Sequence, residues 1–80
     1  MPNMDKNAYV RCRGDEWFLQ PLVAAELESQ GRIWRDYDCE QNTVDNGFPD
    51  EGPCYGVTGD EDSAEELFTI SILNEVCEEF

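Results

Sequence analysis

Hydrophobic and polar residues alternate in two parts of this chain, as they do in half-buried β-strands. The first part covers residues 8–13, where Val10 and Cys12 lie on the inward face of a predicted strand. The second covers residues 32–40, with Ile33, Tyr37 and Cys39 on one face and Trp34, Asp36, Asp38 and Glu40 on the other. Both parts are therefore predicted strands.

Between these strands, hydrophobic residues recur every four positions, which is the spacing of a helix. The recurring residues are Leu19, Val23 and Leu27. A proline inside a helix costs about 3 kcal/mol, so Pro21 is incompatible with one continuous helix. We therefore expect a turn or a short helical piece over residues 15–19, and a main helix that begins at Pro21 and ends near Gly31.

The second half of the chain begins with a stretch rich in turn-forming residues. Glycine, proline and asparagine are concentrated in residues 41–56, which predicts a long loop or an irregular hairpin, and residues 54–58 predict a short third strand. Ser63 followed by Glu66 is a capping box, which favours a helix of about 16 residues. Alternating hydrophobic residues over 68–72 leave a short helix followed by a strand as the alternative.

These elements predict an α+β fold. We expect a small antiparallel sheet of two to four strands, with one or two helices packed on one face. A chain of 80 residues, of which 40% are hydrophobic, can form one domain with one small core. Residues 1–80 are therefore expected to be a single acidic domain.

Charge divides this domain into two unlike halves. Residues 1–35 carry five acids and all five bases, so they are neutral. Residues 36–80 carry the other 14 of the 19 acids and no base, so the whole net charge of −14 belongs to them. Such a concentration of like charge opposes compactness and repels DNA and RNA. We therefore expect a folded acidic protein that does not bind nucleic acid directly.

Several classes of chemistry are excluded by the residues present. The chain has no histidine, which removes Ser/His and Cys/His nucleophiles and histidine metal sites. Its four cysteines are separated by 26, 14 and 22 residues, unlike the close pairs of zinc and iron–sulfur sites. The acidic stretches also lack the spacing of a calcium-binding loop. We expect a protein that is not an enzyme and has no metal and no cofactor.

Hydropathy and cysteine use indicate the compartment. The sequence has no hydrophobic run that would serve as a signal peptide or a transmembrane helix. We therefore expect a cytoplasmic protein, in the host cytoplasm if a phage encodes it, with no membrane contact. In that compartment the cysteines are expected to be reduced, and Cys12 is expected to be buried and inert.

One short segment resembles a carrier protein. Asp62-Ser63 followed by Glu66-Leu67 is similar to the helix of acyl carrier proteins, which carry phosphopantetheine on the serine of an Asp-Ser-Leu motif. Ala64 stands where that motif has leucine, and only 17 residues follow Ser63. The resemblance implies a modified Ser63, whereas the capping box predicts that Ser63 caps a helix.

Rows of carboxylates form the candidate partner-binding site. On a strand, alternate residues lie about 6.6 Å apart, and on a helix, residues three or four apart lie about 5 to 6 Å apart. Such rows imitate the spaced charges of a nucleic-acid backbone, and a nearby tryptophan would supply an apolar anchor. The candidate residues are Trp34, Asp36, Asp38, Glu40, Asp60, Glu61, Asp62, Glu65 and Glu66.

In size, acidity and lack of catalytic motifs the chain looks like small inhibitors from phages and mobile elements. These include anti-CRISPR and anti-restriction proteins, several of which are nucleic-acid mimics. The resemblance implies that the partner is a basic nucleic-acid-binding protein or a nucleoprotein complex. Two alternatives remain: an acidic antitoxin or immunity protein that neutralises a basic toxin, and a protein-binding module that uses exposed aromatic residues without mimicry.

Overall fold

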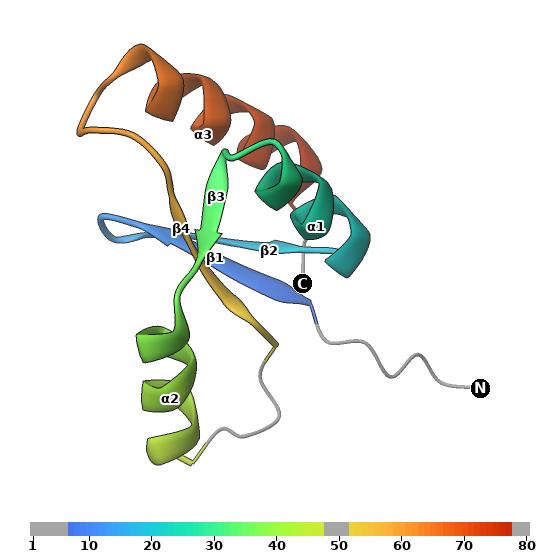
Figure 1. Ribbon diagram of the computed structural model, residues 1–80, viewed down its shortest axis with the longest axis vertical. Coiled ribbons are helices and arrows are strands. Elements are labelled where there is room, and N and C mark those ends of the chain that lie inside the picture. The colour runs from blue at the N-terminus through green and yellow to red at the C-terminus, as the bar shows by residue number, and fades with distance from the viewer. Residues whose placement is uncertain (1–6, 48–51, 78–80) are drawn as a thin grey trace.

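The computed structural model describes residues 7–47 and 52–77, which contain a four-stranded sheet and three helices (Figure 1). In chain order the elements are β1 (Ala8–Cys12), β2 (Asp15–Leu19), α1 (Pro21–Ser29), β3 (Ile33–Arg35), α2 (Tyr37–Asp45), β4 (Cys54–Val57) and α3 (Ala64–Val76). Within these described ranges, no helix is both long and apolar enough to cross a membrane.

The predicted α+β class is confirmed. The strand order is β2-β1-β4-β3. The pairs β1–β2 and β3–β4 are antiparallel, as expected, but the central pair β1–β4 is parallel. The sheet is therefore mixed. Parallel strands need a long crossover connection, and the chain between β1 and β4 provides one, which includes α1, β3 and α2.

Helices α1 and α3 cover one face of the sheet, and the hydrophobic core lies between them and the strands. The buried cluster consists of Ala8, Val10, Trp17, Leu19, Ala24, Leu27, Ile33, Tyr55 and Leu73. The indole N–H of Trp17 donates to Asn74 Oδ1 at 2.8 Å, so this polar group has a partner. Helix α2 lies apart from this layer: Figure 1 shows α3 at one end of the molecule and α2 at the other.

Residues 15–19 form strand β2, so the turn or helical piece expected there is wrong. Arg13 and Gly14 have φ angles of 44° and 92°. Two successive positive φ angles are the mark of a type I′ turn, whose twist suits a tight hairpin. Trp17 and Leu19 then alternate into the core, so the segment follows the period of a strand.

The strand expected over residues 32–40 is also wrong in its second half. The side chain of Asp36 accepts a hydrogen bond from the backbone N–H of Cys39 at 3.0 Å and so caps the start of α2. Asp38 and Glu40 lie in the first helical turn, where negative charge is favoured. The three acids therefore do not share a strand face, and the row proposed from their alternation does not exist.

The helix predicted from Pro21 is confirmed at both ends. Pro21 is its first residue and Ser29 its last, with Gln30 as the C-cap. Gly31 follows the cap, and its φ of +78° is accessible to glycine without strain. The backbone N–H of Gly31 donates to Glu28 O at 2.9 Å, and that of Arg32 donates to Leu27 O at 3.0 Å. These two bonds form a Schellman motif.

The C-terminal elements match the predictions in part. Strand β4 confirms the third strand, and α3 is one continuous helix, which excludes the alternative with a strand. Ser63 Oγ accepts from the N–H of Glu66 at 3.1 Å, which is one half of the predicted capping box. The reciprocal bond differs, because Glu66 Oε1 accepts from the N–H of Asp62 at 3.0 Å and the N–H of Ser63 donates to Asp60 O. Helix α2 occupies the first part of the predicted 41–56 loop, while residues 48–51 lie outside the described ranges.

Candidate partner-binding surface

Two acids that were expected to face a partner, Asp36 and Glu40, instead form ion pairs and hydrogen bonds with other residues of the chain. Glu40 pairs with both Nε and Nη2 of Arg35, and its Oε2 also accepts from the backbone N–H of Cys54 at 3.2 Å. Asp36 caps α2 and lies 4.0 Å from the guanidinium of Arg11. Both residues therefore hold α2 against the sheet.

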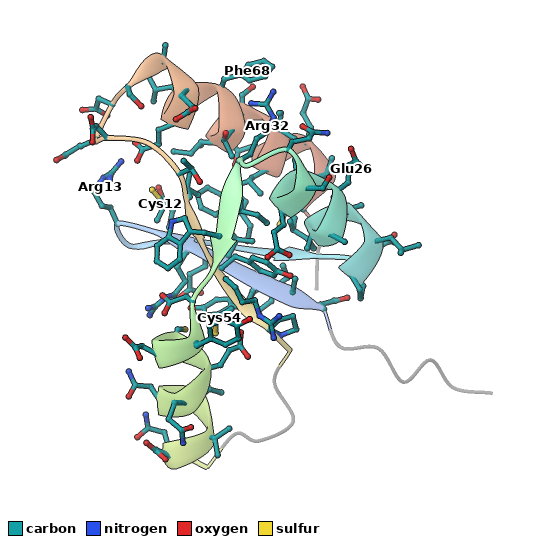
Figure 2. All side chains as sticks on the ribbon, viewed as in Figure 1. Cys12, Arg13, Glu26, Arg32, Cys54 and Phe68 are labelled. Carbon is teal, nitrogen blue, oxygen red and sulfur yellow. The ribbon has the colours of Figure 1, made fainter. Side chains whose placement is uncertain are left out.

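The structure also corrects the prediction for Glu66, which was expected to face a partner but is buried and anchors two segments of the chain. Its side chain is 1% exposed and pairs with Arg13 of the β1–β2 turn. It also accepts from the backbone N–H of Asp62 at 3.0 Å, and the Cys12 thiol donates to it at 3.6 Å. Figure 2 shows Arg13 and Cys12 on the hairpin beside the start of α3. Glu66 therefore ties the hairpin to the chain that enters α3.

The ionisation of Glu66 follows from these contacts. Burial raises the pKa of its carboxyl group, but the hydrogen bonds from Asp62 N–H and from Arg13 lower it further, so the pKa of Glu66 lies below its usual value. Burial and the neighbouring Glu66 charge raise the pKa of the Cys12 thiol. Cys12 is thus a part-buried thiol, not the fully buried one expected, and its raised pKa favours the protonated form.

Four exposed acids project from the segment that Glu66 anchors. They are Asp60, Glu61, Asp62 and Glu65, and we call this set the acidic loop. The segment is held in shape by a hydrogen bond from Ser63 N–H to Asp60 O at 3.0 Å. Gly59 packs so closely that a Cβ there would lie 2.9 Å from Ser63 Oγ. The acidic loop is therefore a fixed display of carboxylates, which lowers the entropy lost on binding.

Arg13 is the cation closest to this loop among the ion pairs of the described residues. Its Nε lies 4.0 Å from Glu61 Oε2, but the Glu61 side chain is 72% exposed, so water screens this contact strongly. Sequence reasoning missed Arg13 as a positioning residue. The available signal was the Arg13-Gly14 pair between two alternating segments, which fits a hairpin turn.

Trp34 lies on the face of the sheet opposite α1 and α3. Its ring lies directly over Gly56 of the neighbouring strand, where a Cβ would come within 2.3 Å of the indole. Gly56 thus permits the tryptophan to lie flat against the sheet. With 49% of Trp34 exposed, the ring offers an apolar surface to solvent, as the sequence predicted.

A shallow pocket of about 340 Å³ adjoins this tryptophan. Its lining includes Arg11, Arg13, Glu16, Trp34 and Asp36, so both signs of charge occur around one aromatic ring. Tryptophan and arginine are both enriched at protein–protein interfaces.

In the described parts of the chain, no three acids or cysteines are grouped as a metal site would require. Comparisons of this chain with protein-family models, with curated proteins and with solved structures found no match. Its function is therefore inferred from the two surfaces described above.

Salt is expected to stabilise this fold. The net charge is −14, and the exposed acids outnumber the ion pairs formed by Arg11, Arg13 and Arg35. Salt screens the repulsion between these acids, so Tm should rise by about 3 to 6 °C between low and physiological ionic strength. Thermal unfolding followed by circular dichroism measures this. A steady fall in Tm with added salt would mean that the ion pairs outweigh the repulsion.

Proposed function

We propose that this chain is a small acidic inhibitor that binds the nucleic-acid-binding surface of a basic protein. The observation that carries the proposal is the acidic loop, in which four exposed carboxylates stand on a segment anchored by the buried Glu66. The anchor holds the four carboxylates in one arrangement, so they would reach a partner already ordered.

The chemistry of the partner follows from the carboxylates. Arginine forms paired hydrogen bonds with carboxylate and phosphate groups alike, so a surface of Lys and Arg that binds phosphates can accept the acidic loop. Opposite charges also steer the encounter, which speeds association at low salt. The inhibitor would then occupy the surface that the nucleic acid needs.

A second candidate function rests on Trp34. The half-exposed ring beside the mixed-charge pocket has the composition of an interface hot spot. In this reading the chain is a protein-binding module that does not imitate nucleic acid. Its partner would contact the open face of the sheet, and nucleic acid would not compete for the contact.

Affinity capture followed by competition tests the main proposal. The tagged chain is used to capture proteins from a nuclease-treated host lysate, and the captured protein is purified and titrated with its own nucleic acid. We expect mutually exclusive binding and an affinity for this chain that weakens as salt rises. The chain itself should cause no gel shift with DNA or RNA. A stable ternary complex of partner, nucleic acid and this chain would contradict mimicry.

The variant Trp34→Ala separates the two candidates. If the acidic loop carries binding, the truncation should weaken it by no more than about threefold, as for a residue at the rim. If Trp34 is the anchor, loss of about 2 kcal/mol or more is expected, which is about thirtyfold. Isothermal titration with the captured partner measures the difference.

A further inference from the structure

Two buried cysteines meet where α2 joins the sheet. Cys39 and Cys54 are 5% and 1% exposed, and their Sγ atoms lie 2.7 Å apart. A disulfide bond is about 2.05 Å long, so a movement of less than about 1 Å would close the bond. We propose that Cys39 and Cys54 form a disulfide that fixes α2 to β4, with a low-molecular-weight disulfide as the oxidant.

The backbone around these cysteines holds them in place. The N–H of Asp36 donates to Cys54 O at 2.9 Å, and the N–H of Cys54 donates to Glu40 Oε2 at 3.2 Å. Residues on both sides of Cys39 are therefore bonded to the backbone of Cys54. The close approach of the two sulfurs is thus a consequence of how α2 docks, and it does not depend on side-chain rotation alone.

The contact between Cys39 and Cys54 also holds α2 on the sheet. Among the described residues of α2, Cys39 is the one with a buried side chain. A helix of nine residues is too short to be stable by itself in water. The contact of Cys39 with Cys54 is therefore the apolar anchor of α2, and a covalent bond at this point would limit its detachment.

The reaction balances as a thiol–disulfide exchange. One cysteine thiolate attacks the oxidant RSSR and releases one RSH, and the second cysteine then displaces the remaining RSH. The protein loses two protons and two electrons, and the oxidant is reduced to two thiols. Burial, and then the hydrogen bond with Cys39, raise the pKa of Cys54 to about 12, so exchange in the folded state is slow. The oxidant must therefore reach the thiols before α2 docks.

Refolding in a glutathione redox buffer satisfies that requirement. The full chain is reduced, unfolded, refolded with reduced and oxidised glutathione, and then alkylated under denaturing conditions so that every remaining thiol is labelled. Cleavage after glutamate places the four cysteines in separate peptides, with Cys39 in residues 29–40 and Cys54 in residues 52–61. We expect these two peptides to be joined, with a mass lower by two hydrogens than that of the separate thiols.

The cross-link should also stabilise the fold. It closes a loop of 15 residues, for which the chain-entropy model predicts a rise in Tm of about 10 to 20 °C over the reduced protein. The double variant Cys12→Ser/Cys77→Ser keeps the pair and should show the same shift between oxidised and reduced forms. The variant Cys39→Ser should show none.

Two results would overturn the proposal. One is a refolded protein in which Cys39 and Cys54 are still thiols, and are therefore alkylated, or are joined to Cys12 or Cys77. The other is an oxidised form whose Tm lies within about 2 °C of the reduced form. The peptide map of the unaltered chain decides the first point even if a cysteine variant does not fold.

Discussion

The variant Glu66→Ala is expected to lower Tm by more than about 10 °C, because it removes a buried carboxylate that several groups share. The backbone N–H of Asp62 would lose its acceptor, and Arg13 would lose its buried partner. The hairpin and the start of α3 would no longer be joined at this point. Thermal unfolding of the two proteins measures the loss.

Glu65→Ala is the matched control, since Glu65 is exposed and lies in the same helical turn. It removes the same charge and the same side-chain atoms, but no buried partner, so we expect a change of no more than about 2 °C. Equal losses for the two variants would show that Glu66 is not an anchor.

The pH dependence provides a second test of Glu66. Its pKa in the folded protein lies below the ordinary value of 4.5, so the unfolded chain binds a proton there more readily. The stability that Glu66 contributes is therefore present above about pH 4.5 and is lost as the pH falls through the folded pKa. Glu66→Gln should lack this part of the acid transition. If wild type and Glu66→Gln lose stability in parallel between pH 5 and 3, the shifted carboxyl is not Glu66.

Neutralising the acidic loop is expected to slow association with the captured basic partner by about 10- to 100-fold at low salt. The variant combines Asp60→Asn, Glu61→Gln, Asp62→Asn and Glu65→Gln. Each substitution keeps the shape of the side chain, and the anchor Glu66 is unchanged, so the fold should remain intact. Surface plasmon resonance at several salt concentrations measures the association rate.

Its control removes the same number of charges elsewhere. The residues changed are Glu26→Gln, Glu28→Gln, Asp45→Asn and Glu75→Gln, all of them exposed. Both variants carry the same net charge, so a difference between them reports where the charge lies. Equal slowing would mean that the total charge steers binding and that the acidic loop is not the contact surface.

Asp36 and Glu40 are left out of the binding test for a structural reason. Both residues hold α2 to the sheet through Arg11 and Arg35, so changing them would disturb the fold as well as the charge. The acids that remain for a partner at this end of the molecule include Asp38, which is exposed in the first turn of α2.

Local signals in the sequence were sufficient for several elements. The strand over residues 8–13, the helix that begins at Pro21 and the cap at Ser63 follow from period, proline position and capping chemistry. Each depends on residues only a few positions apart. The exposure of Trp34 also follows from strand alternation, which places it on the face opposite the buried Ile33.

The sequence by itself thus determined the α+β class, the ends of α1, the start of α3 and the concentration of acids after Arg35. Only the tertiary structure decided which acids are free. Ion pairing and burial join residues distant in the chain, such as Arg13 with Glu66, and no local pattern records such a pairing. The same holds for Cys39 and Cys54, whose sulfurs meet because α2 docks on β4.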